Sequence, residues 1–234
     1  MFDKHYTYLL LNLATIFFPF VLSFDKKVAF YKKWPQLVWG IGITGAFFIV
    51  WDMLKTHFGV WSFNPDYLLG IYIGNLPIEE WLFFITVPYA CIFIHECLKA
   101  YLPDYLLKPS KYIAPIVIII LLILAAFNYT RIYTFITFTF TAVFLGIYIK
   151  VYKNRLGGRF WMAYIVHLIP LFIINGFLTA LPVVIYNDAE NLGIRLYTIP
   201  IEDTIYSMLL LLMNVGIYEW RGRLKVPVGK VTIT

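Results

Sequence analysis

Seven long runs of apolar residues divide the chain, and short polar segments separate them. Each run is close to the roughly 20 residues that a helix needs to cross a hydrocarbon core. No small-x-small cleavage site follows the first run, so we interpret it as a helix rather than a signal peptide. The pattern predicts an all-α integral membrane protein with seven transmembrane helices, at 6–22, 37–51, 78–98, 113–127, 132–149, 160–181 and 201–218.

Composition supports this fold class. Hydrophobic residues make up 61% of the chain and the mean hydropathy is +0.77, which is outside the range of water-soluble domains. The formal charge of +6 comes from basic residues in the connections between apolar runs. Membrane topology explains these residues better than nucleic-acid binding, so we expect no nucleic-acid partner. Lysine and arginine concentrate after runs one, three, five and seven, which predicts an external N-terminus and a cytoplasmic C-terminus.

Two acidic motifs open the third and seventh runs. They read LPIEE at 76–80 and IPIED at 199–203. Proline suits the first turn of a helix, where its missing N–H leaves no bond unmade, so we expect Pro77 and Pro200 to begin membrane helices whose first turns carry the acids. An acid inside hydrocarbon costs roughly 2.5–3.5 kcal/mol on insertion scales. Two such pairs at matching positions indicate a function. The segments that precede the motifs, 55–75 and 182–198, are mixed in character and predict a structured or re-entrant loop.

The motifs belong to an internal repeat. Their offset (202 − 79 = 123) also relates several polar and turn residues, which favours duplication over coincidence. Runs one to three then match runs five to seven, and run four restores the orientation of the first copy. We expect parallel repeats at 1–111 and 131–234, joined by a helix within 112–130. Glu79 and Glu202 should then lie at similar depth, where they could face each other across one cavity. The further matched pairs are Asp52 with Asn175, Asn64 with Asn187, Gly70 with Gly193, Pro77 with Pro200 and Glu96 with Glu219.

The acids of the motifs permit two interpretations. Acids in a first turn complement the helix dipole, which would keep them ionised near the interface. Alternatively, acids held away from water keep a proton and can donate it to a weak base. Neighbouring residues on a helix point about 100° apart, so one acid of each pair would face a cavity, and the sequence leaves open which. The polar residues Asp52, Asn175, Asn64 and Asn187 either serve helix ends and loops or hydrogen-bond the acids.

Other residue types narrow the chemistry. Aromatic side chains follow the acids into the membrane and either line a cavity, where ring faces stabilise cations, or face lipid: Trp81, Phe83, Phe84, Tyr89, Phe93 and Tyr206. Glu96 and Glu219 are expected to pair with cations such as Lys99 or Arg221. We expect packing roles for His95, His167, Cys91 and Cys97. The chain shows no glycine fingerprint for a nucleotide, no histidine pairs at metal spacing and no aspartate-rich diphosphate motif, so we expect no cofactor and no metal.

On these motifs the chain resembles the flavin-independent membrane lycopene cyclases, which carry Pro-x-Glu-Glu in each of two three-helix repeats. Asp203 departs from that pattern by replacing a glutamate. The resemblance implies a redox-neutral isomerase of a bacterial or archaeal cell membrane, with lycopene as its membrane-embedded substrate and β-rings as its product. It implies that Glu79 or Glu80, with Glu202 and Asp203, gives a proton and takes one back. Association with other carotenoid enzymes is a further partner that the resemblance suggests.

Two functions of other classes fit the same features. A proton-coupled transporter would also use intramembrane acids, parallel repeats and a central cavity. An assembly subunit would carry the acids for structural reasons. Formation of a cyclic carotenoid on expression separates the enzyme from both.

Overall fold

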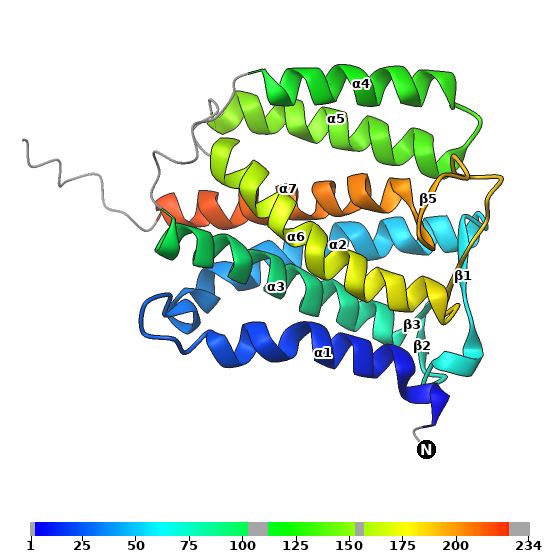
Figure 1. The fold of residues 1–234 in the computed structure, drawn as a ribbon, viewed down its shortest axis with the longest axis horizontal. Coiled ribbons are helices and arrows are strands. Elements are labelled where there is room, and N and C mark those ends of the chain that lie inside the picture. The colour runs from blue at the N-terminus through cyan, green and yellow to red at the C-terminus, as the bar shows by residue number, and fades with distance from the viewer. Residues whose placement is uncertain (1–2, 103–111, 153–156, 225–234) are drawn as a thin grey trace, which may run out of the picture.

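The computed structural model describes residues 3–102, 112–152 and 157–224, and its helices lie side by side in one bundle (Figure 1). The predicted all-α membrane fold is confirmed, because six helices are long and apolar enough to cross a membrane, while α4 is shorter over the residues described. The helices are α1 (Thr7–Leu22), α2 (Trp34–His57), α3 (Ile78–Tyr101), α4 (Ile113–Phe127), α5 (Ile132–Tyr152), α6 (Gly157–Ala180) and α7 (Ile201–Leu224).

Short strands and turns gather at the end of the bundle where α3 and α7 begin, at the right of Figure 1; we call this the motif end. Three antiparallel pairs form there. The segment expected as a structured or re-entrant loop is therefore partly the last turn of α2 and partly these strands. The pairs are β1 (Trp61–Phe63) with β4 (Val184–Tyr186), β2 (Tyr72–Ile73) with β3 (Leu76–Pro77), and β5 (Arg195–Leu196) with β6 (Ile199–Pro200). Short 3-10 helices occupy Lys4–Tyr6, Phe30–Lys33 and Pro65–Tyr67.

The two repeats are visible in the packing. Helix α1 packs against α3 as α5 packs against α7, and α2 packs against α7 as α6 packs against α3. Strands β1 and β4, one from each repeat, pair with Ser62 opposite Ile185, which are equivalent positions under the offset of 123. Gly70 and Gly193, also equivalent, both have positive φ (79° and 70°), a conformation that glycine adopts without steric cost. The backbone therefore repeats where the sequence predicts.

Helices α3 and α7 begin at the predicted residues, Ile78 and Ile201, so each motif proline lies just before the first helical turn and not inside it. Pro77 is extended, with φ −66° and ψ 151°, and α3 begins at Ile78. Strand pairing explains the difference, since Pro77 lies opposite Tyr72 and Pro200 lies opposite Arg195. Each motif thus leaves a two-stranded turn and enters the helix directly, which places both acids in the first turn as expected.

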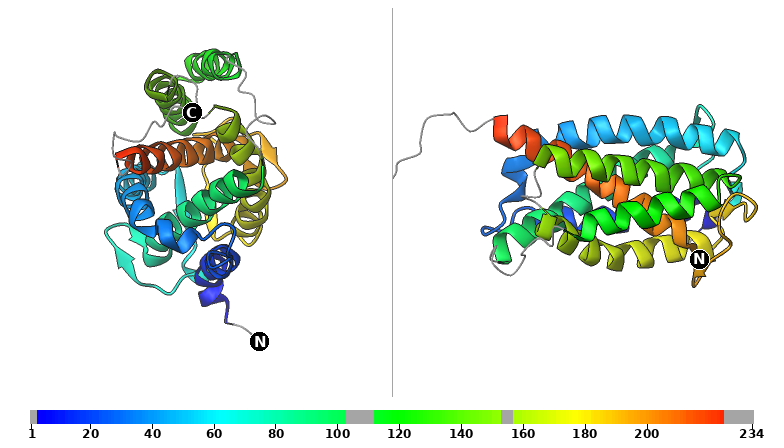
Figure 2. Two further views of the ribbon diagram at one scale, coloured as in Figure 1. Left: turned by 90° about the vertical axis from the view of Figure 1, so that its left-hand side faces the viewer. Right: turned by 90° about the horizontal axis from the view of Figure 1, so that it is seen from above.

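Helix α4 has no counterpart among the other six and packs on α5 at the edge of the bundle (Figure 2, left). It connects the two repeats in the sequence. Many of the basic residues behind the topology prediction fall in 103–111, 153–156 and 225–234, outside the described residues. The orientation in the membrane and the repeat limits at 111 and 131 therefore stay predictions.

Candidate active site

Three carboxyl groups from three helices line one small cavity at the motif end of the bundle. They are Asp52 of α2, Glu80 of α3 and Asp203 of α7, and each side chain is buried. The cavity measures about 50 Å³. Aromatic rings form much of its wall: Tyr8, Trp61, Phe63, Phe83, Tyr133, Tyr186 and Tyr206. The site combines acids with an aromatic lining, as the sequence suggested.

Glu80 and Asp52 form the first half of the site. Both side chains line the cavity, and the two carboxyl groups are close enough to interact with each other. The hydroxyl group of Tyr8 donates to Glu80 Oε2, and the hydroxyl group of Tyr206 donates to Asp52 Oδ1 at 2.9 Å. Each carboxyl group therefore has one tyrosine donor in addition to its carboxyl neighbour. Asp52, for which the sequence left a helix-end role and a role beside the acids open, lies beside Glu80, and Tyr206 lines the cavity.

Asp203 forms the second half and accepts three hydrogen bonds. Tyr133 donates to Oδ1 at 2.6 Å, while Tyr186 and Asn175 donate to Oδ2 at 2.8 Å and 3.0 Å. Burial, followed by the charge of Asp203, raises the pKa of Tyr186 well above its usual value, so this hydroxyl group stays a donor across the physiological range. Of the two roles that the sequence left open for Asn175, the structure shows hydrogen bonding to an acid. The two halves are related by the repeat, because Glu80 matches Asp203 and Asp52 matches Asn175.

The preceding acids, Glu79 and Glu202, do not face this cavity together, contrary to the prediction. Glu79 Oε1 accepts from the amide of Leu69 at 2.6 Å, and Glu202 Oε1 accepts from the amide of Leu192 at 2.7 Å. Thr134 also donates to Glu202. Adjacent side chains diverge by about 100°, so when Glu80 and Asp203 point inward, their neighbours point toward the loops. Each holds the loop of its own repeat against the helix that it begins.

Five other predicted site residues lie outside the cavity, and two of them, Pro77 and Pro200, are in the strand pairs that precede the acids. Asn64 Oδ1 accepts from the amide of Asp66, and Asn187 Oδ1 accepts from the amide of Ala189, so both asparagines shape turns instead of binding the acids. This is the ordinary behaviour of asparagine in a loop. Trp81 lies beside the strands and donates to the carbonyl of Ile73 at 3.3 Å. Of the aromatic residues that the sequence singled out, Phe83 and Tyr206 line the cavity.

Lys55 was missed by the sequence interpretation. Its side chain is 2% exposed, and its Nζ lies 3.6 to 4.7 Å from the centroids of four rings: Trp51, Tyr206, Trp61 and Tyr133. Within the described part of the chain, this Nζ has no hydrogen-bond partner. It attracts Asp52, Asp203 and Glu80 electrostatically. Its position three residues after Asp52, near several aromatic residues, could have indicated a role in the site. An ordinary lysine at the membrane interface has the same sequence pattern, so the position alone does not distinguish the two.

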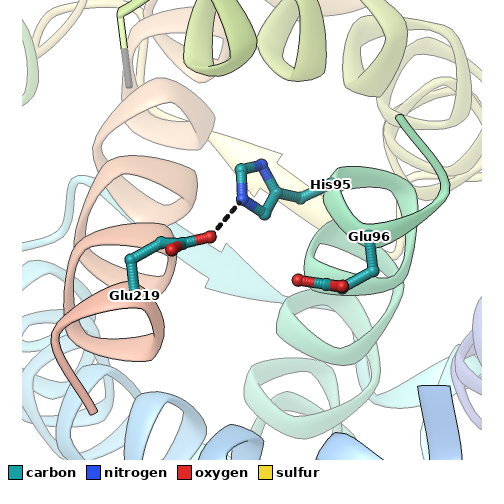
Figure 3. A group of neighbouring side chains, drawn as sticks. All are labelled: His95, Glu96 and Glu219. Atoms are coloured by element: carbon teal, nitrogen blue, oxygen red, sulfur yellow. Dashed lines mark hydrogen bonds and ion pairs between the residues drawn. The ribbon is translucent and has the colours of Figure 1, made fainter. Parts of the chain in front are cut away.

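A second polar cluster lies near the other end of the bundle, where α3 and α7 cross (Figure 3). His95 and Glu96 come from α3 and Glu219 comes from α7, and their ligand atoms are close enough to hold a metal ion. In this structure both carboxylates form ion pairs with lysines. Lys99 binds both Glu96 and Glu219, Lys33 binds Glu96, and His95 Nε2 lies 2.9 Å from Glu219. The predicted pairing with Lys99 is confirmed, and the cluster is an ion-pair network between the repeats.

The family model described as lycopene cyclase matches residues 5–98 and again residues 128–221. The chain belongs to the lycopene cyclase family. The two matched segments begin 123 residues apart, the offset already seen between the acidic motifs (128 − 5 = 123). Neither the curated proteins nor the solved structures contain a match to this chain.

Membership in the lycopene cyclase family fits the remaining observations. It identifies the chain as an enzyme of carotenoid biosynthesis that is embedded in a membrane and carries two fused repeats. Its substrate is a carotenoid. Family membership indicates the activity but assigns no role to individual residues.

Proposed function

We propose that the chain is a lycopene β-cyclase in which the Glu80–Asp52 pair supplies the proton. The contact between these two buried carboxyl groups is the observation that carries the proposal. Ionising both of two buried carboxyl groups that line one small cavity is unfavourable, so in this proposal the pair shares one proton. A proton held in an aromatic pocket away from water is available to a weak base such as a carbon–carbon double bond.

The reaction begins when this proton is added to C2 of a linear ψ end group, which leaves a cation at C1. The C5–C6 double bond attacks C1, so the C1–C6 bond closes a six-membered ring and the positive charge moves to C5. Loss of the C6 proton forms the C5–C6 double bond of a β-ring. C2 and C6 are both bonded to C1, so the pair that protonated one atom can deprotonate the other. The product is an isomer of the substrate, and no electrons are exchanged.

Asp203 and the surrounding rings stabilise the positive charge. Three donors converge on Asp203, an arrangement that favours an ionised carboxylate. The ring faces of Trp61, Tyr133 and Tyr206 already surround the basic nitrogen of Lys55, which has no hydrogen-bond partner in the described part of the chain. A carbocation suits the same surroundings, because ring faces attract it and it needs no hydrogen bond. In this proposal Glu79 and Glu202 hold the loops and touch no substrate.

We also propose that the motif end faces the outside of a bacterial or archaeal cell membrane. The support is the alternation of basic residues between the connections, which puts the C-terminus in the cytoplasm. The substrate then reaches the acids from the hydrocarbon layer near its outer surface.

The test uses a lycopene-accumulating bacterial host that expresses the chain. The parent should convert lycopene to γ-carotene and β-carotene, and Glu80→Gln should abolish conversion. The matched control is Glu79→Gln, which makes the same carboxyl-to-amide replacement in the neighbouring residue. This variant should retain at least about a third of the parent activity. Full conversion by Glu80→Gln, at equal protein in the membrane, would overturn the assignment. A proton-coupled transporter would leave the pigment unchanged in every case.

A further inference from the structure

The C-terminal half of α2 and the N-terminal half of α5 form an apolar cleft beside the acidic cavity. The cleft measures about 410 Å³, within the range of small-molecule sites. Aliphatic and aromatic side chains line it, among them Val50, Leu54, Ile136 and Phe140, and Lys55 is the charged residue of its described lining. Val50 is 58% exposed and Leu54 is 49% exposed, so the cleft opens to the surroundings of the bundle. In a membrane those surroundings are hydrocarbon.

One layer of side chains separates this cleft from the acids. Trp51 and Lys55 line the cleft, while Tyr206, Trp61 and Tyr133 line the acidic cavity. Lys55 Nζ lies 4.0 Å from the Tyr206 ring centroid, and the rings of Trp51 and Tyr206 are 5.3 Å apart. Lys55 makes no hydrogen bond among the described residues, so a change of its rotamers breaks none. Its stem is unbranched and flexible, whereas its neighbours are rigid rings, so Lys55 is the part of the partition that can change rotamer.

The residue that separates the cleft from the acids differs between the repeats. Under the offset of 123, Leu178 takes the position of Lys55 and is buried in the core. Pro170 and Ile174, which match Phe47 and Trp51, line a separate cavity of about 30 Å³ that α3 and α1 also border. The flexible basic side chain beside the acids is therefore a feature of α2, and α6 carries an apolar one in its place.

We infer that the α2–α5 cleft admits and holds the linear carotenoid, and that Lys55 is the gate between the cleft and the acids. The inference rests on the proposed function and names its substrate path. The acidic cavity of about 50 Å³ is smaller than an isoprenoid end group, so a path must open before reaction. The cleft is the adjoining space that is large enough, is apolar and is open to the bilayer. A linear carotenoid carries no polar group, which matches a lining with almost no hydrogen-bonding groups.

The test places a bulky side chain in the cleft and, as a control, the same side chain at the equivalent position of the other repeat. Val50→Trp fills the cleft, and Ile173→Trp places the same side chain at the equivalent exposed position of α6, outside the cavities of the described residues. In membranes supplied with lycopene, Val50→Trp should raise KM about tenfold with little change in kcat, because binding is hindered and the acids are untouched. Ile173→Trp should match the parent within about twofold.

Leu54→Trp is a second blocking variant at a separate cleft position, and Val50→Ala keeps the cleft open and should behave as the parent. Variants are compared with the parent only if their melting temperatures match, and at equal amounts of protein in the membrane. Parent-like KM in both blocking variants, or an equal rise in Ile173→Trp, would overturn the inference, and would indicate that a lipid acyl chain occupies the cleft. Absence of cyclic product from the parent would instead refute the proposed function and the inference with it.

Discussion

Glu79 offers a sharp test, because sequence and structure give it different roles. Glu79 Oε1 accepts from the amide of Leu69 at 2.6 Å in a site with no exposure to solvent. Glu202 does the same with Leu192 in the second repeat. These acids should therefore support folding of the motif end more than the reaction. Removing the acceptor should lower stability, whereas replacing it with an amide acceptor should largely preserve the loop.

The magnitude follows from the hydrogen bond that is lost. A buried hydrogen bond to a charged group contributes about 1.5–3 kcal/mol. In a chain of this size, 1 kcal/mol corresponds to about 2–4 °C of melting temperature. Glu79→Ala should therefore lower the melting temperature by about 3–12 °C, and Glu202→Ala should have an effect of similar size. Glu79→Gln keeps an oxygen acceptor and should lower it by less than about half as much.

The assay is thermal unfolding of the purified protein in detergent, together with lycopene conversion at a temperature where every variant is folded. Glu79→Gln and Glu202→Gln should both remain active. The reasoning would be refuted by a Glu79→Gln variant that melts like the parent yet loses conversion as fully as Glu80→Gln. That result would return Glu79 to the reaction itself.

Three further predictions concern charge and backbone strain. Lys55→Met removes a nitrogen that lies over four ring faces and attracts three buried acids, and it should lower the free energy of unfolding by about 2 kcal/mol, measured by denaturant unfolding; unchanged stability would count against these contacts. Tyr197 has φ of 60° where the equivalent residue of the first repeat is Gly74, so Tyr197→Gly should raise stability by about 1 kcal/mol, and a lower melting temperature would contradict the strain. Asp203→Asn should leave substrate binding intact and reduce kcat, seen as an unchanged KM in membrane assays; a rise in KM alone would assign Asp203 to binding.

Apolar runs and the offset of 123 predicted the architecture well. The seven helices begin within three residues and end within six residues of the predicted runs, and α3, α4, α5 and α7 begin at the predicted residues. The period and length of an apolar run are local properties, so they are readable without tertiary contacts. The repeat added the pairing of distant segments, such as Asp52 with Asn175 on the wall of one cavity.

The details of the site depended on information that the sequence does not carry. Which acid of each motif faces inward depends on helix rotation, and packing of α3 against α1, α2, α6 and α7 sets that rotation. The same limit applies to Asn64 and Asn187, whose side chains could satisfy either a turn or an acid. Lys55 escaped notice because its burial depends on rings from α5, α7 and β1 that converge on it from distant parts of the chain.

The claim at the centre of this account is that cyclisation begins with a proton stored on the protein, on the Glu80–Asp52 pair. The most direct measurement is a single turnover of lycopene by enzyme that has been equilibrated in D₂O, followed by mass spectrometry and NMR of the product. The account predicts one deuterium at C2 for each new ring. Cyclic product that carries no deuterium would contradict it.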